Sequence, residues 1–276
     1  MKLEKIWNLI VGELNNTLKN RWVILYSLSY FLVGEGLTQF SLLGVSNLGL
    51  EAVGRIMATL INVILYLTSI LSLILGGLSI ISEKESGILE WLCSEPISKS
   101  EIIISKFIGL LISISTATIL GFGLIGWFLA IYFPLNDMIK YVMLIPATVI
   151  FSTTCIAIGM LISVISRNKL EAFGLVFILW ITMIFIYDLV LMGLTISLDL
   201  NEQLVFAFTV LNPFETSRIL MMYIIDPTLT FLGSTGIYTA RDLGSGLFFI
   251  LIIILILYAI IALLLATFIF IKRDII

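Results

Sequence analysis

Histidine is absent from this chain of 276 residues, and charged residues make up only 12% of it. Without histidine, the chain can hold neither a histidine-ligated metal site nor a histidine general base. Soluble domains carry about 25% charged residues. The low charge, together with a mean hydropathy of +1.18, indicates an integral membrane protein. The net charge of −3 argues against a nucleic-acid partner.

Cysteine is scarce, and the sequence has no phosphate-binding glycine loop. Cys93 lies in a polar stretch and Cys155 in an apolar run, so we expect no disulfide between them. Without a GxxxxGK[S/T] segment, the chain cannot hydrolyse ATP by the P-loop route. Residues 1–21 are polar and lack an apolar core with a cleavage site, so we expect no cleaved signal peptide.

Long apolar runs, in contrast, are abundant. About 20 apolar residues suffice for a helix to cross some 30 Å of hydrocarbon. Six runs reach that length, and they cover residues 22–43, 56–81, 102–133, 139–166, 172–198 and 247–271. The sequence therefore predicts an all-α polytopic membrane protein with six transmembrane helices in a single domain over 1–276. The second run is rich in small and polar residues, so we expect it to face protein rather than lipid.

Two further segments are apolar without being long enough to span. Residues 1–21 carry apolar side chains at helical spacing, which predicts an amphipathic helix in the membrane interface. Residues 199–245 contain two short apolar pieces joined by Asn212-Pro213. Pieces of this length predict re-entrant or surface-lying helices on the outer face, before the last span.

The positive charges fix the expected orientation. With six spans both termini share one side, which carries eleven of the fifteen basic residues, namely Lys2, Lys5, Lys19, Arg21, Lys84, Lys99, Lys106, Arg167, Lys169, Lys272 and Arg273. The other side carries Arg55, Lys140, Arg218 and Arg241. The positive-inside rule then places both termini in the cytoplasm.

The polar island 82–101 separates the second and third runs on the same, cytoplasmic side. Its apolar residues Leu89 and Leu92 fall at helical spacing, which predicts a short helix that breaks at Pro96. Ser98 and Glu101 have the spacing of a capping box, so a new helix is expected to start near Ser98 or Ser100. From the residues alone, a solvated hairpin loop explains the island equally well.

A family resemblance favours a function for this island. The string Glu85-x-Gly87-x-x-Glu90-x-Leu92-x-x-x-Pro96-x-Ser98-Lys99, followed by Lys106, resembles the cytoplasmic loop of ABC-2-type permeases. In that family the loop forms a coupling helix that docks on the ATP-binding subunit. The resemblance therefore implies coupling roles for Glu83, Glu85, Gly87, Glu90, Leu92, Pro96, Lys99 and Lys106. The family usually has Arg where this chain has Lys99, which keeps the charge but not a bidentate contact.

Two carboxylates lie within the predicted spans. Asp188 falls within the fifth run, where a carboxylate costs about 2.5–3.5 kcal/mol, and no Lys or Arg is expected at its depth. It is either a substrate or gating site or a helix-packing hydrogen bond. Glu35 lies in the first run between two glycines. It is either paired or protonated near the far interface, or part of a translocation path.

The segment after Leu211 narrows the resemblance. Asn212 and Pro213 predict a turn and a helix start, and Glu215 can pair with Arg218 at i, i+3. With Phe185-x-Tyr187-Asp188-Leu189, this segment resembles the NosY-type permeases, the membrane subunits of the ABC complex that matures nitrous-oxide reductase.

That resemblance implies several partners in the inner membrane and on both sides of it. They are a second copy of the chain, a cytoplasmic ATPase that binds ATP and Mg²⁺, and a periplasmic accessory protein contacted near Asn212, Pro213, Glu215 and Arg218. No cofactor is expected in this chain itself. Its nine methionines are scattered and it has no histidine, so we favour transmission of motion over conduction of copper. Motion would enter at 85–106 and leave through 201–241.

Three other functions stay open. An ABC-2 exporter of a drug, lipid or polysaccharide would use the polar second span and Asp188 as its path. An ion-coupled transporter would use Asp188 and Glu35. An intramembrane enzyme is disfavoured, because the sequence offers no histidine and no pair of carboxylates at one depth.

Overall fold

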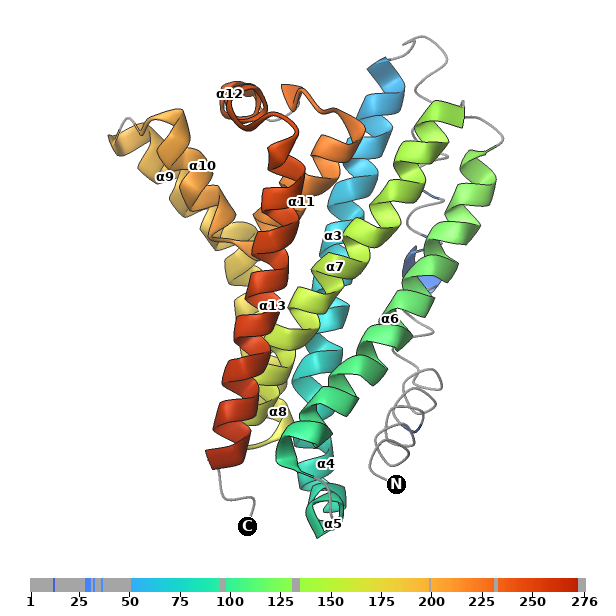
Figure 1. The fold of residues 1–276 in the computed structure, drawn as a ribbon, viewed down its shortest axis with the longest axis vertical. Helices are drawn as coiled ribbons and strands as arrows, with labels where there is room; N and C mark the ends of the chain where they lie inside the picture. The colour runs from blue at the N-terminus through green and yellow to red at the C-terminus, as the bar shows by residue number, and fades with distance from the viewer. Residues whose placement is uncertain are drawn as a thin grey trace.

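The computed structural model describes Gly12, residues 28–30, Leu32, Gly36 and residues 51–94, 98–130, 135–198, 200–230 and 233–272. All regular structure in these residues is helical (Figure 1). The elements are α3 (Glu51–Ser79), α4 (Ile81–Glu85), α5 (Ile88–Ser94), α6 (Lys99–Leu129), α7 (Leu135–Ile165), α8 (Lys169–Ile181), the π-helical turn η1 (Thr182–Ile186), α9 (Tyr187–Leu198), α10 (Glu202–Val210), α11 (Pro213–Ile225), α12 (Gly233–Leu243) and α13 (Gly246–Lys272). The predicted all-α polytopic class is confirmed.

Five of the six predicted spans lie in the described residues. Helices long and apolar enough to cross a membrane cover Met57–Glu85, Lys99–Trp127, Met138–Ile165, Lys169–Leu198 and Gly246–Lys272. They match the second to sixth apolar runs. Apart from a few positions, the amphipathic segment 1–21 and the first run 22–43 lie outside the described residues, and so does Glu35.

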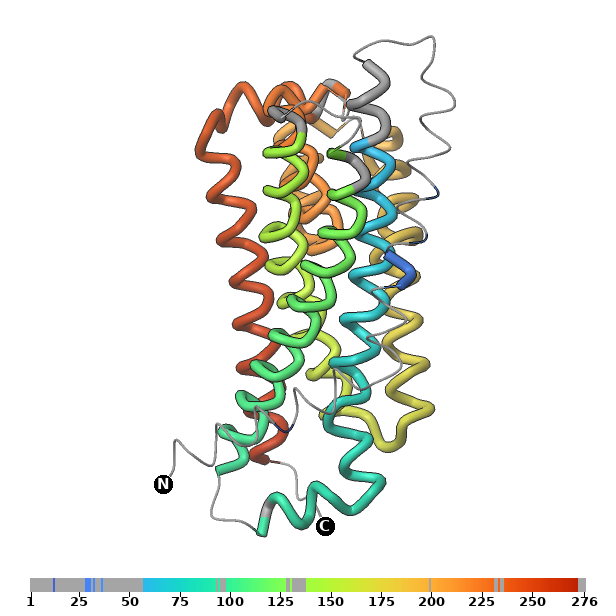
Figure 2. The backbone as a smooth tube through the Cα atoms, turned by 90° about the vertical axis from the view of Figure 1, so that its right-hand side faces the viewer, coloured from blue at the N-terminus to red at the C-terminus, as the bar shows by residue number. Residues whose placement is uncertain are grey.

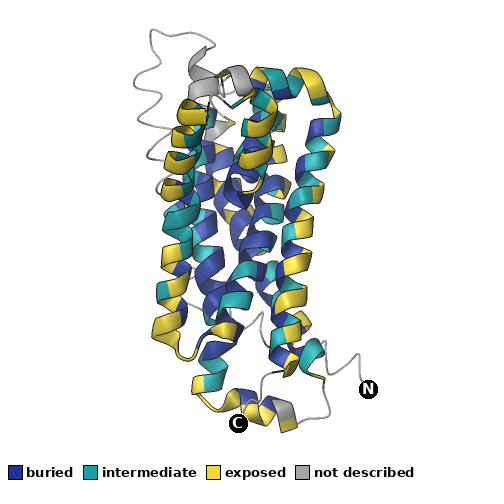
Figure 3. Cartoon of the chain, turned by 90° about the vertical axis from the view of Figure 1, so that its left-hand side faces the viewer, coloured by how far each residue is buried: buried dark blue, intermediate teal, exposed yellow. Residues whose placement is uncertain are grey.

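The centre of the bundle is the contact between α3 and α7. A Cβ on Gly159 would lie 2.6 Å from the Leu73 carbonyl oxygen, and one on Gly76 would lie 2.5 Å from the Ile156 carbonyl oxygen. Only glycine permits this approach, which is how small residues let helices pack in lipid. Figure 3 shows the buried residues gathered along this inner axis. The prediction that the second span faces protein is therefore confirmed.

Residues 202–225 form a re-entrant hairpin of α10 and α11. Its tip lies halfway along the length of the bundle, because the hydroxyl of Tyr258, midway along α13, donates to the Leu211 carbonyl over 2.9 Å. From there α11 runs back beside α3, α7 and α13 with most of its residues buried. Lys140 holds its far end through a 2.9 Å hydrogen bond to the Ile225 carbonyl. Of the two predicted alternatives, α10–α11 is thus re-entrant.

The two ends of the bundle carry short helices that lie across it. At one end, α12 is seen end-on in Figure 1 and from the side in Figure 2. At the other end α4 continues from α3, and α5 crosses the bundle next to the ends of α6 and α13 (Figure 2). The fifth span is interrupted at Thr182–Ile186 by a π-helical turn, which the sequence pattern did not predict. Beyond this turn α9 leans away from the bundle with α10 (Figure 1).

Candidate functional site

The polar island folds as two short helices joined by a tight turn. After α4 the chain turns at Ser86-Gly87, where Gly87 has a φ of +75°. That conformation favours glycine because it has no Cβ. The next helix, α5, buries Leu89 and Leu92 against the bundle. The predicted short helix is confirmed, while Pro96 lies outside the described residues.

The start of α6 is the predicted capping box. The Ser98 amide donates to the Glu101 carboxylate over 2.8 Å, and the Glu101 amide donates to the Ser98 hydroxyl over 3.3 Å. These reciprocal bonds satisfy two amides that a helix start leaves without intrahelical acceptors. Lys99, the first residue of α6, reaches the Ile271 carbonyl at the end of α13, 3.3 Å away.

Two ion pairs fasten α4 to neighbouring helices. Lys106 of α6 forms a close pair with Glu83, and the Lys106 side chain is nearly buried. Lys169, at the start of α8, lies 3.3 Å from Glu85, and its backbone amide also donates to Glu85 over 2.7 Å. Glu83, Glu85 and Lys106 therefore have partners inside this chain. The Glu83–Lys106 pair is largely shielded from solvent, whereas the Glu85–Lys169 pair lies at the exposed surface of the segment.

The surface left free on this segment is apolar at its centre. The Trp91 side chain is 64% exposed and Ile88 is 49% exposed. Glu90 and Gly87 are exposed beside them. The residues predicted from the sequence to contact the ATPase include Gly87 and Glu90 but not Ile88 or Trp91. Helical spacing could have found Trp91, which points away from the side of α5 that carries Leu89 and Leu92. Ile88 lies one turn from Leu92, so the spacing does not predict its exposure. We call Gly87, Ile88, Glu90 and Trp91 the coupling face.

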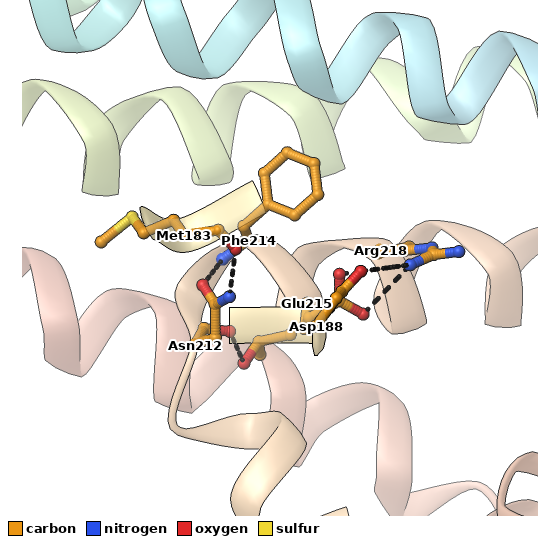
Figure 4. A network of polar contacts seen from close by, with 7 residues as sticks. Met183, Asp188, Asn212, Phe214, Glu215 and Arg218 are labelled. Carbon is orange, nitrogen blue, oxygen red and sulfur yellow. Dashed lines mark hydrogen bonds and ion pairs between the residues drawn. The ribbon is translucent and has the colours of Figure 1, made fainter. Parts of the chain in front are cut away.

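A second polar cluster lies where the re-entrant hairpin meets the fifth span. Arg218 of α11 places Nη1 3.7 Å from Asp188 Oδ2 and 3.2 Å from Glu215 Oε1 (Figure 4). The predicted pairing of Glu215 with Arg218 is confirmed. The expectation that no Lys or Arg lies at the depth of Asp188 is wrong. Because α11 folds back into the bundle, it carries Arg218 to the depth of Asp188. Arg218 therefore no longer counts among the basic residues assigned to the outer side, which leaves Arg55, Lys140 and Arg241.

The tip of the hairpin is held by side chains that complete its backbone hydrogen bonds. Asn212 accepts from the Phe214 amide over 3.0 Å and donates from Nδ2 to the Met183 carbonyl over 2.6 Å (Figure 4). Tyr187 donates to the Phe208 carbonyl. Pro213 occupies the first position of α11, where no amide hydrogen is needed. A polar chain reversal at this depth requires such partners, since lipid offers none.

A cavity of about 190 Å³ adjoins this cluster. Its walls come from α9, α10, α11, α12 and the turn before α12, and its lining residues are Leu191, Val205, Phe206, Thr209, Glu215, Ile219, Leu229, Gly236 and Thr239. The lining is apolar except for the Glu215 carboxylate and two threonine hydroxyls.

The turn that follows α11 is organised by Asp226. Its carboxylate accepts from the Thr228 amide and the Thr230 amide, each over 3.0 Å, and from both threonine hydroxyls. Partial burial opposes ionisation of Asp226, but the hydrogen bonds outweigh it and lower the pKa of this carboxyl below its ordinary value. The turn also holds Leu229 at a positive φ of 51°.

Comparison with known proteins decides the family. A sequence model of the ABC-2 family transporter proteins matches residues 7–275. The chain belongs to the ABC-2 family.

Two relatives of this ABC-2 protein are each described as a probable ABC transporter permease protein NosY. The one from Stutzerimonas stutzeri is 25% identical over 227 residues, which cover 79% of this chain and 81% of the relative. The one from Pseudomonas aeruginosa is 25% identical over 223 residues, covering 78% and 80%. This chain is therefore the membrane component of a transport system, and it is similar to permease subunits.

In this ABC-2 protein, the two polar regions occupy opposite parts of the bundle. The coupling face lies at the end where α5 crosses the helices, and the Asp188–Arg218–Glu215 cluster lies beside the re-entrant hairpin (Figures 1 and 2). Among the described residues, no group of three or more His, Cys, Asp or Glu could hold a metal ion.

Proposed function

We propose that this chain is the membrane subunit through which a separate cytoplasmic ATPase does its work, and that the ATPase docks on the coupling face. The observation that carries this proposal is the exposed Trp91 beside Ile88 on a segment fastened at Glu83 and Glu85. Large exposed apolar side chains mark interaction sites, and tryptophan is prominent among the residues that dominate binding energy. A fastened segment also passes an applied force to its neighbours.

Two copies of the chain would form the transmembrane unit, with both termini and the coupling face in the cytoplasm. The excess of basic residues on that side supports this orientation. The expected contact with a periplasmic accessory protein near Asn212, Pro213, Glu215 and Arg218 does not fit the structure, which buries the first three of these residues at the hairpin tip. Such a partner would instead contact the opposite end, where α12 lies across the bundle.

The finer proposal is a role in maturing the copper site of nitrous-oxide reductase. It is supported by the two NosY relatives and by the resemblance of the segment around Asp188 and Asn212. The chain has no histidine, which argues for transmitting ATP-driven motion to the outer partner, with copper or sulfur handled by that partner.

The test is co-expression with the candidate ATPase, followed by purification and measurement of ATPase activity with and without this chain. We expect a complex containing two copies of the chain and stimulated ATP hydrolysis. Trp91→Ala should weaken binding to the ATPase, and Glu90→Lys should reduce stimulation. Trp127→Ala is the matched control, because Trp127 is 77% exposed near the opposite end of α6. Equal effects of the Trp91 and Trp127 variants would contradict docking at the coupling face.

A second candidate function is export of a small molecule, and the cavity beside Glu215 favours it. In that case, filling the cavity with Leu191→Trp should block transport while docking at the coupling face persists. An ion-coupled transporter is less well supported, because Asp188 already has Arg218 as its counter-ion.

A further inference from the structure

The junction between α3 and the pair of helices α4–α5, which we call the coupling segment, depends on a side chain from another helix. Ser163 Oγ accepts hydrogen bonds from the backbone amides of Ile80 and Ile81, each over 3.0 Å. Ile80 lies between α3 and α4, and Ile81 is the first residue of α4. Ser163 lies on α7, two residues before its end. A single hydroxyl thus joins α7 to the place where the chain enters the coupling segment.

The chemistry of a helix start explains why this hydroxyl matters. The first amides of a helix have no intrahelical acceptor, and a side chain at the N-cap usually supplies one. The N-cap of α4 is Ile80, which makes no side-chain capping bond. Ser163 supplies the oxygen in its place. Ile80, Ile81 and Ser163 are each at most 3% exposed, so water is poorly placed to replace it.

The packing of α7 connects this hydrogen bond to the far end of the bundle. From Ser163, α7 runs the length of the bundle and packs against α3, α13 and the re-entrant helix α11. At its other end Lys140 bonds the last carbonyl of α11. Displacement of α4 therefore acts on α7 through Ser163, and α7 touches the outer hairpin directly. The Glu83–Lys106 and Glu85–Lys169 pairs act on α6 and α8 instead.

We infer that Ser163 is the positioning residue that couples movement of α4–α5 to α7 and, through α7, to the outer hairpin. This inference rests on the proposed function and deepens it. The hydroxyl has two roles. It joins the start of α4 to α7, and it carries the stroke of the ATPase to the outer side.

Two substitutions of nearly equal shape distinguish the effect of losing the Ser163 hydroxyl from the effect of adding volume at this position. Ser163→Thr keeps an acceptor oxygen, whereas Ser163→Val replaces it by a methyl group, and both add the same bulk. Ser152→Val is the control on the same helix, because Ser152 is fully buried and its hydroxyl donates to Val149 within α7. In each background, Cys93 and Cys155 are replaced by serine and a spin label is placed at Asp242→Cys on the exposed face of α12.

The full complex in nanodiscs then gives three readouts, which are ATPase binding, ATPase stimulation and the label-to-label distance between protomers with and without ATP. For Ser163→Val we expect binding to persist, stimulation to fall about tenfold and the ATP-dependent distance change to disappear. Ser163→Thr and Ser152→Val should match the parent. Equal behaviour of the Thr and Val variants, or loss of binding in the Val variant alone, would overturn the inference.

The junction itself is tested on the permease without ATPase. Amide exchange at Ile80 and Ile81 should be about tenfold faster in Ser163→Val than in Ser163→Thr, and equal exchange would also overturn the inference. Failure of the parent chain to bind any ATPase, with the exchange difference intact, would instead count against the proposed function.

Discussion

The side-chain amide of Asn212 donates to the backbone carbonyl of Met183 over 2.6 Å, and so joins the tip of the re-entrant hairpin to the π-helical turn in the fifth span. Single π-helical turns inside α-helices are rare and occur frequently at functional sites. Here the contact comes from a residue that also caps α11 by accepting from the Phe214 amide.

Replacing Asn212 by Asp separates these two roles. Asn212→Asp can still accept from the Phe214 amide but cannot donate to Met183, and it sets two oxygens against each other. We expect a loss of about 1–3 kcal/mol of stability, measured by thermal unfolding in detergent. Asn201→Asp is the control, because Asn201 caps α10 by accepting from the Leu204 amide at an exposed site. An equally large loss in the control would remove the special role of the Met183 bond.

The shared guanidinium of Arg218 predicts an order of severity among charge-removing variants. Arg218→Gln leaves Asp188 and Glu215 without their cation within the bundle, and removing one partner of a buried pair costs about 3–5 kcal/mol. Glu215→Gln should cost less, and Asp188→Asn least, because the Asp188 side chain is 44% exposed and that of Glu215 only 8%. Expression and thermal unfolding of the three variants would check the order. Arg241→Gln, on the exposed face of α12, should behave as wild type.

Features that depend on neighbouring residues in the chain could be predicted from the sequence, whereas contacts that depend on the tertiary fold could not. Hydropathy placed five spans correctly and located the polar island between two of them, because hydropathy is a local property of the chain. Spacing also found the Ser98–Glu101 capping box and the Glu215–Arg218 pair, since helix geometry alone brings such residues together. It missed the Asp188–Arg218 pair, because that contact requires the hairpin to fold back into the bundle.

In the coupling segment, too, local features could be predicted from the sequence and tertiary contacts could not. Charge made Glu83, Glu85 and Lys106 look like surface contacts, yet the structure pairs them with residues of this chain. No local pattern reveals that Lys169, more than eighty positions away, meets Glu85. The bond from α7 to the start of α4 is likewise invisible in the sequence, because serine is common in this chain and only tertiary packing selects Ser163.

The close approach of α3 and α7 predicts a strong difference between two glycines. In Gly159→Ala the new methyl group would lie 2.6 Å from the Leu73 carbonyl oxygen and 2.9 Å from the Gly77 amide, both rigid backbone atoms. Relieving such overlap costs about 1–3 kcal/mol or more. In Gly174→Ala the methyl group meets nothing within 4 Å, and a helical alanine is favoured by about 1 kcal/mol. The midpoint temperature of thermal unfolding should therefore fall in Gly159→Ala and stay the same or rise in Gly174→Ala. Equal midpoints would contradict the packing described for this interface.

The Asp226 turn predicts a dependence on pH that a neutral variant should lack. Hydrogen bonds to the ionised carboxyl, acting against partial burial, lower the pKa of Asp226 from 3.8. A carboxyl with a lowered pKa contributes stability above its unfolded value and loses it as pH falls through its folded value. Asp226→Asn should thus expose the Thr228 and Thr230 amides at neutral pH, with about fivefold faster exchange than in wild type. The ratio of variant to wild-type exchange, taken at one pH at a time, should approach one as pH falls below 3.8, because wild type then loses the same bonds. Asp242→Asn, on the exposed face of α12, should leave these amides unchanged at every pH. A ratio that stayed constant from neutral to acid pH would show that the charge of Asp226 does not hold this turn, and that its shape alone does.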